Sequence, residues 1–363
     1  MNIPKLKYTI LDGYIIKKFL GTYIFAIILI LAITIMFDIN EKLDSFLKAP
    51  LKATIFDYFL NFLPYFANQF SPLFTFIAVI FFTSKLADNS EIIAMLSSGM
   101  SYKRLLVPYM LSAAVIAGAT FILSAYVIPP ANEKRIAYQN TYVKNKQVNY
   151  GSNIQLMVSE NEIAYFSRYE KATKTGYRFS LETFDDKKLI SRLTAQSIKY
   201  DTLYQWTVKD YMIRDFQGTR EKITRGSRLD TIIPIQPRDF LISENDNEIM
   251  TTPDLSQYID SQRERGVANI KNFEIEYHKR YAMTAAAFIL TIIGMSLSSK
   301  KVKGGMGINI GIGLVLSFSY ILFMTVTSSF AISGLTSPML AMWIPNILYS
   351  IIAVILYRRA SHG

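Results

Sequence analysis

Six long uncharged stretches constrain the fold of this chain more than any other feature of its sequence. Each is 17 to 25 residues long and contains no Asp, Glu, Lys or Arg. They cover residues 19–37, 58–82, 105–128, 281–297, 306–330 and 339–357. A helix of about 20 apolar residues crosses the hydrocarbon core of a bilayer. With 51% hydrophobic residues and a mean hydropathy of +0.22, the chain is expected to be a membrane protein with six transmembrane helices.

Polar residues and prolines interrupt the first half of the second stretch, between residues 61 and 72. A proline inside a transmembrane helix is tolerated where neighbouring helices satisfy the freed carbonyl groups. This half is therefore expected to face protein or a cavity rather than lipid. Residues 38–57 are predicted to form a mixed-charge loop after the first stretch. Pro129 and Pro130 are predicted to end the third stretch.

The distribution of charge predicts the orientation of the helices. Both termini of a chain with six spans lie on one side, and that side carries twelve basic residues against three acidic ones. The basic residues are Lys5, Lys7, Lys17, Lys18, Lys85, Lys103, Arg104, Lys300, Lys301, Lys303, Arg358 and Arg359. Because loops rich in Lys and Arg stay in the cytoplasm, both termini are predicted to be cytoplasmic. The net charge of +11 therefore indicates membrane orientation rather than nucleic-acid binding.

The middle of the chain has a different pattern, which predicts a β-domain outside the membrane. Short alternating segments rich in Tyr, Phe, Thr and Val follow one another from about residue 154 to residue 216. This pattern is typical of an antiparallel β-sandwich or jelly roll. The expected fold is an α-helical membrane protein with six transmembrane helices and an inserted antiparallel β-domain outside the cytoplasm. Its predicted parts are residues 1–128 and 281–363 in the membrane and residues 129–280 in the β-domain with its helical connections.

Residues that could carry out catalysis are scarce. The chain has two histidines and no cysteine, which excludes disulfides, thiolate metal sites and cysteine nucleophiles. The motifs H-E-x-x-H, G-x-S-x-G and G-x-x-x-x-G-K-[ST] do not occur. We therefore expect no catalytic residue, no metal site and no cofactor in this chain. The uncharged stretches also disfavour transport driven by protons or sodium, so energy for any work must come from a partner.

A short polar segment, residues 85–104, separates the second and third stretches. Its acidic residues and Ser90 form a helix-start signal and its glycine a stop signal, so a short helix outside the bilayer is predicted. The residues that define this helix are Asp88, Glu91, Ile92, Met95, Leu96 and Gly99. Its apolar face, with Glu91, could dock on a cytoplasmic partner. Alternatively, the two acidic residues form only a capping box and the apolar residues rest on the membrane surface.

Two lysines follow the first stretch at the level of the outer lipid headgroups. Lys42 and Lys48 could hold the phosphates of an anionic lipid at this position. The alternative is that they are ordinary loop lysines, paired with Glu41 and Asp44.

Two further patterns concern packing. Gly307 and Gly311 form a G-x-x-x-G pattern near the start of the fifth stretch, which is typical of closely packed helices. The rows of aromatic and aliphatic residues in the β-domain could line a groove for acyl chains, or a strand edge could accept a strand from another protein. The alternative is that these side chains fill the core of the β-domain itself.

Several motifs occur along the chain in a fixed order. They are LDGYIIKKFL before the first stretch, MFDINEKLDSFL after it, EIIAMLSSGMSYKRLLVPY, VIPPANEKR, the RLTA…YD…W strand block, IEYHKRYAM, GMSLSSKKVKGGMGINIGIGLVLSFSYILF and WIPNILY. With these motifs the chain resembles the LptF/LptG permease family, the membrane part of the lipopolysaccharide exporter. The LDGYIIKKFL start favours the G-type subunit over the F-type.

The resemblance implies a partnership. Members of the family have six spans and a periplasmic β-jellyroll, and two permeases pair with each other and with two copies of a cytoplasmic ABC ATPase, which binds ATP and Mg²⁺. The ATPases grip a coupling helix, which here matches residues 88–98, with its acidic residue at Glu91. Lipopolysaccharide enters between the first span of one permease and the fifth of the other, and leaves through the jellyrolls to a periplasmic β-jellyroll bridge protein. Basic residues above the first span contact its phosphates, which points to Lys42 and Lys48.

Three other functions agree with parts of the pattern. The chain could be the permease of another envelope lipid or lipoprotein exporter, a membrane-anchored sensor with a ligand-binding β-domain, or an enzyme that acts on lipid. A sensor is expected to have a cytoplasmic signalling domain, but only six residues follow the last stretch. An enzyme is expected to have polar catalytic groups near the bilayer surface, and two histidines do not supply them.

Overall fold

The protein consists of two compact units. The computed structural model describes residues 9–143, 150–170, 173–186, 188–218, 220–237, 246–264, 270–301 and 306–362. The helical unit comprises Met1–Lys144 and Glu274–Gly363, and the β unit comprises Asn145–Phe273. The predicted domain boundaries lie after residues 128 and 280, whereas the compact units divide after residues 144 and 273, because the helix of the third stretch continues to Val143.

Six helices among the described residues are long and apolar enough to cross a membrane, which confirms the six predicted spans. The helices that precede the β unit are α1 (Ile10–Lys48), α2 (Leu51–Ala53), α3 (Leu60–Gln69), α4 (Ser71–Asp88), α5 (Glu91–Ser97), α6 (Tyr102–Ile122) and α7 (Ile128–Tyr138). The π-helical segments are Thr54–Phe59, Leu123–Val127 and Gln139–Val143. The helices that follow the β unit are α11 (Lys271–Ser298), α12 (Met306–Ile332) and α13 (Pro338–Ser361).

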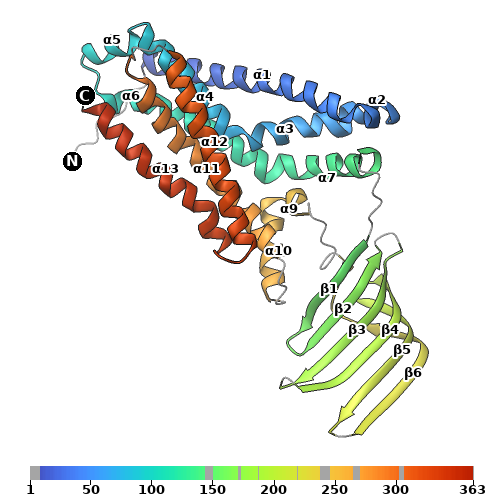
Figure 1. Ribbon diagram of the computed structural model, residues 1–363. Helices are drawn as coiled ribbons and strands as arrows, with labels where there is room; N and C mark the ends of the chain where they lie inside the picture. Colours follow the sequence, from blue (N-terminus) through green and yellow to red (C-terminus); the bar gives the residue numbers. More distant parts are fainter. Residues whose placement is uncertain are drawn as a thin grey trace. The chain divides into compact units, whose positions relative to one another are not determined.

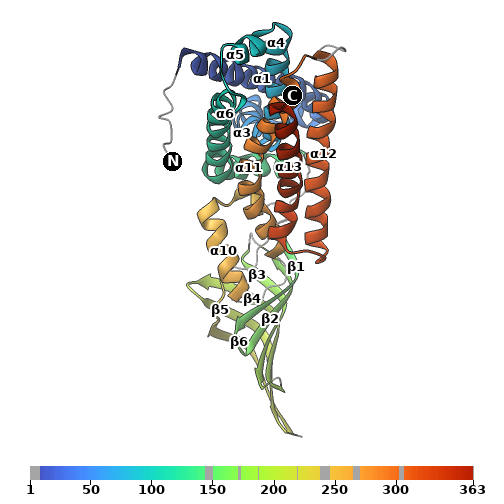
Figure 2. The same cartoon turned by 90° about the vertical axis from the view of Figure 1, so that its left-hand side faces the viewer.

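Helix α4 lies at the centre of the helical unit and packs against both α1 and α12 (Figures 1 and 2). Two glycines on its neighbours allow this close approach. A Cβ atom on Gly294 of α11 would lie 1.9 Å from Val79 Cγ1, and one on Gly313 of α12 would lie 2.2 Å from Ile80 Cδ1. Because both distances are far below van der Waals contact, a larger residue at either position must displace the side chain of Val79 or Ile80 on α4.

The prediction of a mixed-charge loop over residues 38–57 is wrong, because most of this region is helical. Helix α1 continues to Lys48, and its backbone departs from helical angles at Lys42, where φ is −113° and ψ is 18°. After a break at Ala49 and Pro50 the chain is helical again from Leu51. The charged side chains of α1 at this end mark the part of the helix that extends beyond the apolar layer, since 39 residues exceed the roughly 20 needed for a crossing.

The second and third predicted spans both contain prolines, but only the second span is interrupted. The second stretch forms two helices, α3 and α4, which meet at Phe70 with φ −102° and ψ 11°. The prediction that Pro129 and Pro130 end the third stretch is wrong, since the helix continues through them to Val143. A proline clashes with the carbonyl one turn earlier and donates no hydrogen bond. The π-helical segment directly before α7 changes the hydrogen-bond register, and the prolines then occupy the first turn of α7.

The β unit contains a six-stranded antiparallel sheet, which confirms the predicted antiparallel β-domain (Figure 1). Its strands are β1 (Tyr150–Ser159), β2 (Glu162–Glu170), β3 (Thr175–Asp185), β4 (Lys188–Thr202), β5 (Gln205–Gln217) and β6 (Arg220–Ile232). The described strands pair in sequence order, as an up-and-down sheet without the strand crossovers of a jelly roll. The sequence did not predict β6, because nearly all of its side chains are exposed and its residues do not alternate between apolar and polar.

One face of the sheet packs its aromatic residues into the core of the β unit. Trp206, Phe166 and Phe179 are buried together, and Trp206 Nε1 donates a hydrogen bond to the carbonyl oxygen of Ile235 at 3.1 Å. Gly176 leaves room for the ring of Phe166, whose Cδ1 would lie 2.5 Å from an added Cβ. These side chains therefore fill the core of the β unit. This was the alternative to a groove for acyl chains or a strand edge open to another protein. Helices α9 (Asp246–Ile249) and α10 (Thr252–Glu264) also belong to this unit.

Candidate functional site

The predicted short helix is α5, which follows α4 and precedes α6 (Figure 1). Ser90 adopts a left-handed conformation with φ 62° directly before it. Gly99, with φ 90°, donates its backbone N–H to the carbonyl of Leu96 at 3.1 Å and ends the turn, in agreement with the predicted stop signal. A residue other than glycine would be strained at this φ. Helix α5 is thus a short element held between two sharp changes of chain direction.

The capping-box interpretation of this helix is wrong. Asp88 is the last residue of α4, and Ser90 makes no side-chain cap bond among the described residues. The Glu91 carboxylate instead accepts a hydrogen bond from Tyr14 Oη at 2.8 Å and another from Asn89 Nδ2 at 3.1 Å. The bond to Glu91 raises the pKa of the Tyr14 hydroxyl above its ordinary value. Glu91 therefore connects α5 to the start of α1 through Tyr14 and to the preceding turn through Asn89.

The apolar face that was predicted to dock on a partner is packed inside this chain. Ile92 and Met95 are buried in the core of the helical unit, and Leu96 packs against that core. The outward side of α5 carries Ile93, which is 55% exposed, and Ala94, together with exposed serines. Since a buried side chain cannot contact another protein, the available docking surface is this outward side with Glu91.

An ion pair that sequence reasoning missed lies beside α5. Arg104, in the first turn of α6, donates from Nη1 to Asp12 Oδ1 at 2.6 Å and from Nη2 to Asp12 Oδ2 at 2.5 Å. Asp12 also accepts from the backbone N–H of Thr9 at 2.8 Å in a capping box that starts α1. Asp12 precedes the uncharged stretch that begins at Phe19, and the hydrogen bonds from Arg104 lower the pKa of its carboxyl to about 2. The Thr9-x-x-Asp12 spacing is a sequence signal for the capping box, but no sequence pattern indicated the pair with Arg104.

Basic side chains surround α5 on this end of the helical unit. The exposed ones among the described residues include Lys17, Lys18, Lys85, Lys103, Lys300, Lys301, Arg358 and Arg359. Lys5, Lys7 and Lys303 lie outside the described residues. Lys301 Nζ donates to the carbonyl oxygen of Asp88 at 3.5 Å, beside the start of α5. We call this region, comprising the outward side of α5 and the surrounding cations, the α5 surface.

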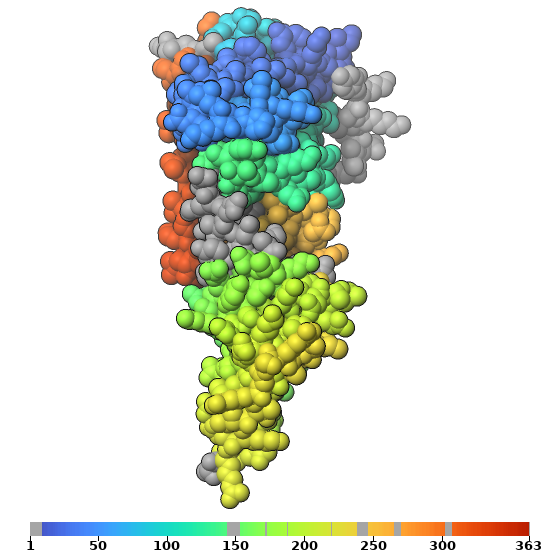
Figure 3. Space-filling model, turned by 90° about the vertical axis from the view of Figure 1, so that its right-hand side faces the viewer, coloured from blue at the N-terminus to red at the C-terminus, as the bar shows by residue number. Residues whose placement is uncertain are grey.

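Lys42 makes internal contacts at the opposite end of α1. Its Nζ pairs with Asp38 and donates to Tyr58 Oη at 2.8 Å, so the prediction that it pairs with Glu41 or Asp44 is wrong. The second carboxylate oxygen of Asp38 is buried and has no partner among the described residues. Lys48 is exposed. Figure 3 shows the surface at this end, where α1 to α3 in blue lie beside α7 in green.

The G-x-x-x-G pattern does not pack helices within this chain. Gly307 and Gly311 are exposed, and no heavy atom of the described residues lies within 4 Å of an added Cβ at either position. They begin a largely exposed apolar side of α12 that continues through Val315 and Leu322. Helix α1 is exposed in the same way, with Phe25 and Ile28 more than half accessible. Two spans thus present apolar sides that this chain does not cover.

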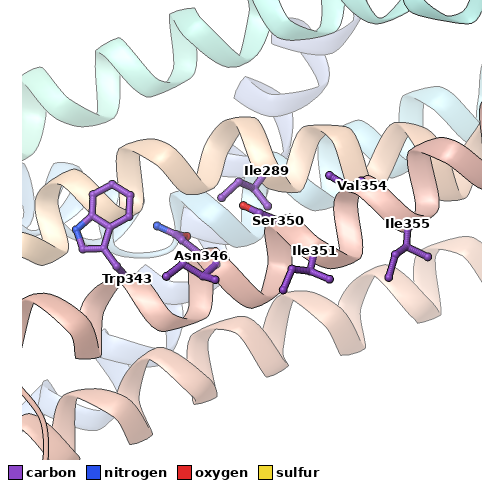
Figure 4. A pocket seen from close by; sticks show the side chains of 8 residues that line it. Ile289, Trp343, Asn346, Ser350, Ile351, Val354 and Ile355 are labelled. Carbon is purple, nitrogen blue, oxygen red and sulfur yellow. The ribbon is translucent and has the colours of Figure 1, made fainter.

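A shallow apolar groove of about 480 Å³ runs along α13 beside α11 (Figure 4). Trp343, Ile351 and Ile355 line it from α13, and Ile289 lines it from α11. Asn346 also lies in the groove, but its side chain already donates to the carbonyl oxygen of Ala282 at 2.8 Å and accepts from Tyr320 Oη at 2.9 Å. The groove therefore offers apolar surface rather than polar groups that could recognise a ligand.

Clusters suited to metal binding do not occur in the described part of the chain, where no group of three His, Asp or Glu side chains lies close enough together. The sites described above contain ion pairs, hydroxyl bonds and apolar surfaces, which can bind and transmit force but do not form a nucleophile with its base.

Comparison with known proteins agrees with this architecture. Residues 13–359 match the family described as "Lipopolysaccharide export system permease LptF/LptG". No match to the chain was found among curated proteins. The family match covers nearly all of both units, including α5 and the exposed spans α1 and α12. The chain therefore belongs to the LptF/LptG family of lipopolysaccharide export permeases and is a multi-pass inner-membrane protein.

Proposed function

We propose that this chain is one permease subunit of an ABC transporter that extracts lipopolysaccharide from the inner membrane and delivers it to a periplasmic β-jellyroll bridge protein. In this proposal it pairs with a second permease of the same family and with two copies of a cytoplasmic ATPase, which bind ATP and Mg²⁺. Both termini and α5 are cytoplasmic, the β unit is periplasmic, and the subunit is of the G type. The permease itself performs no catalysis.

The observation that carries the proposal is the α5 surface. A short helix with one side fixed in the core and the other side exposed can be pushed without unfolding, because its buried residues Ile92 and Met95 hold it in place. Glu91 retains acceptor capacity for a cation of the partner, since an ionised carboxylate offers about four lone-pair sites and two are used. The cations around α5 also support a cytoplasmic position for this side, because loops rich in Lys and Arg stay in the cytoplasm.

The exposed apolar sides of α1 and α12 support a lipid cargo. Extraction of a lipid costs about 0.8 kcal/mol for each CH₂ group removed from the bilayer, so a molecule with several acyl chains needs another apolar surface. An exposed apolar side on each of two spans, repeated in a second permease, supplies one. Lys48 and, after release from Asp38, Lys42 are then the basic residues closest to the phosphates of the cargo.

The test is co-purification. Co-expression with candidate ATPases and permeases is expected to yield a complex that contains an ATPase and a second permease. Ile93→Asp, which places a charge on the outward side of α5, and Glu91→Ala are expected to reduce recovery of the ATPase. Ile223→Asp is the matched control, because Ile223 is an isoleucine of similar exposure, 50%, in β6. Wild-type protein that brings no ATPase with it would contradict the proposal.

The cargo contacts need a separate experiment. A photoreactive amino acid at residue 48 or residue 42 is expected to crosslink lipopolysaccharide during ATP turnover, and the same label at exposed Ile223 is expected to give none. Crosslinks to protein alone from both lysine positions would count against lipid phosphates at this end of α1.

A further inference from the structure

Two contacts fasten the start of α1 to the segment that carries α5. The first is the Asp12–Arg104 pair, in which both carboxylate oxygens accept from the guanidinium at 2.5 and 2.6 Å. Two parallel bonds of this kind fix orientation as well as distance. The second is the 2.8 Å bond from Tyr14 Oη to Glu91. The Tyr14 bond is made to the first residue of α5, and the Asp12 pair is made to Arg104 in the first turn of α6, so the chain is tied to α1 at the start of α5 and again after its end.

Packing joins the same segments. Ile15 and Phe19 of α1, Ile92 of α5 and Leu105 of α6 are all essentially inaccessible and belong to one core cluster. Phe19 also stacks on Phe82 of α4, with ring centroids 5.2 Å apart. Close-packed side chains transmit displacement because they have no free volume to absorb it. The first turns of α1, helix α5 and the start of α6 therefore form one mechanical element.

Beyond Phe19, α1 exposes much of its apolar surface, although Tyr23 Oη still lies 2.9 Å from Ser71 Oγ of α4 and Phe46 packs against the rings of Tyr58 and Tyr138. The exposed side chains that follow Phe19 on α1 include Ile24, Phe25, Ile28 and Ile33. Only 6% of the most apolar stretch of α1 is buried, against 78% for α4 and 61% for α11. Among the described spans, the most apolar stretch of α1 is thus the least buried, so a displacement of the start of α1 requires little repacking along that stretch.

We propose that the Asp12–Arg104 pair and the Tyr14–Glu91 bond together form a clamp through which a displacement of α5 is passed to α1. The proposal rests on the proposed function, because it needs a partner that pushes α5. Asp12, Tyr14 and Arg104 are positioning residues in this arrangement and contact neither the cargo nor ATP. Glu91 belongs to both the clamp and the docking surface, so it joins the partner to α1 directly.

The experiment uses the complete complex in proteoliposomes and measures four quantities. They are thermal stability, recovery of the ATPase, the rate of ATP hydrolysis, and lipopolysaccharide released per ATP hydrolysed. Arg104→Ala is expected to keep the ATPase bound and hydrolysing, while lipopolysaccharide released per ATP falls about tenfold, which is a usual size for coupling between two sites. Lys134→Ala is the control, since it removes the same charge from an exposed residue of α7 that lies outside the α5 surface, and it is expected to leave that ratio unchanged.

Two further variants separate coupling from folding. The exchange Asp12→Arg with Arg104→Asp restores an ion pair of opposite polarity and is expected to recover most of the lost transport per ATP. Tyr14→Phe removes only the hydroxyl and is expected to lower the same ratio by a smaller factor, with stability unchanged. Transport per ATP at the wild-type value in both Arg104→Ala and Tyr14→Phe would overturn the clamp.

The outcomes distinguish the clamp from the proposed function. Failure of the proposed function appears in the wild-type protein, which would then neither bind an ATPase nor transport. Failure of the clamp appears only in the variants, while the wild-type complex transports normally. Loss of ATPase recovery in Arg104→Ala at unchanged stability would also overturn the clamp, because it would assign Arg104 to the docking surface instead.

Discussion

Helices α1 and α4 both contain an uncharged stretch of a predicted span and pack against each other, but these stretches are buried to very different extents. In the most apolar stretch of α1 6% of the residues are buried, against 78% in that of α4. The more apolar helix is the more exposed one. In water the opposite is expected, since apolar surface is removed from solvent. In a bilayer, lipid solvates the apolar side chains of α1, so hydropathy no longer determines which helix is buried inside the protein.

The buried helix is distinguished by small and hydroxyl-bearing side chains. Ser71 Oγ of α4 lies 2.9 Å from Tyr23 Oη and 3.0 Å from Thr120 Oγ1. Thr83 Oγ1 lies 3.1 Å from Tyr109 Oη, so two further hydroxyls are satisfied within the core. Packing and interhelical hydrogen bonds drive helix association in lipid, and both favour α4. The comparison therefore assigns α4 to a fixed scaffold and α1 to a surface that is free to meet a partner or cargo.

The largest effect is expected where α4 is packed most closely. Gly294→Leu and Gly313→Leu each insert a side chain where even a Cβ atom would overlap Val79 or Ile80. Overpacking of this kind costs about 1–3 kcal/mol or more, so we expect little folded protein in detergent and a lower melting temperature. Gly311→Leu, on the open side of α12, is the control and is expected to fold normally. Equal losses of folded protein in Gly311→Leu and Gly313→Leu would contradict the claim that close packing against α4 is what distinguishes the two positions.

Two phenylalanines of α1 sharpen the comparison within a single helix. Phe19 is fully buried and Phe25 is 65% exposed. Phe19→Ala is expected to lower the free energy of unfolding by about 3 kcal/mol, because it leaves a cavity against Phe82 and Tyr109. Phe25→Ala is expected to change stability by less than about 0.5 kcal/mol, as is usual for exposed positions. Detergent unfolding measures both, and a larger loss for Phe25→Ala would mean that α1 packs elsewhere.

The smallest effect is expected from the hydroxyl chain of α4. Ser71→Ala removes the link between Tyr23 and Thr120, and one such bond in a membrane protein contributes about 0.6 kcal/mol. Ser329→Ala on α12, whose hydroxyl bonds only to the carbonyl oxygen of Thr325 in its own helix, is expected to have no measurable effect. A double variant with Thr120→Val should add little to Ser71→Ala, since both remove the same contact. Full additivity would show that the hydroxyls act independently.

Much of the fold could be predicted because the signals are local. The six spans and the antiparallel strands up to β5 follow from runs of residue types that a membrane or a sheet requires. Strand β6 could not be predicted, because an edge strand with exposed side chains on both faces has no alternating pattern. The continuation of the helix through Pro129 could not be predicted either, because it depends on a π-helical segment that no residue pattern marks.

The sequence predicted where the candidate site lies along the chain, but not which side of α5 faces the core. The sequence located α5 between two spans and marked its end at Gly99. It assigned Ile92 and Met95 to the docking side, whereas they face the core, because seven residues of helix have the same periodicity whichever side is buried. Tyr14, which bonds to Glu91, and Asp12, which pairs with Arg104, lie 77 and 92 residues away from these partners in the chain, so no local spacing indicated the two contacts.

The sequence by itself determined that the chain crosses a membrane six times, carries an antiparallel β-domain and belongs to the LptF/LptG family, because composition and motifs decide these properties. Only the tertiary structure decided which side of each span is buried, since apolar residues are equally soluble in lipid and in the protein core. It also decided that α1 is tied to α5 through Tyr14 and to α6 through Asp12. Contacts of this kind depend on how the helices pack, and packing is a property of the whole bundle.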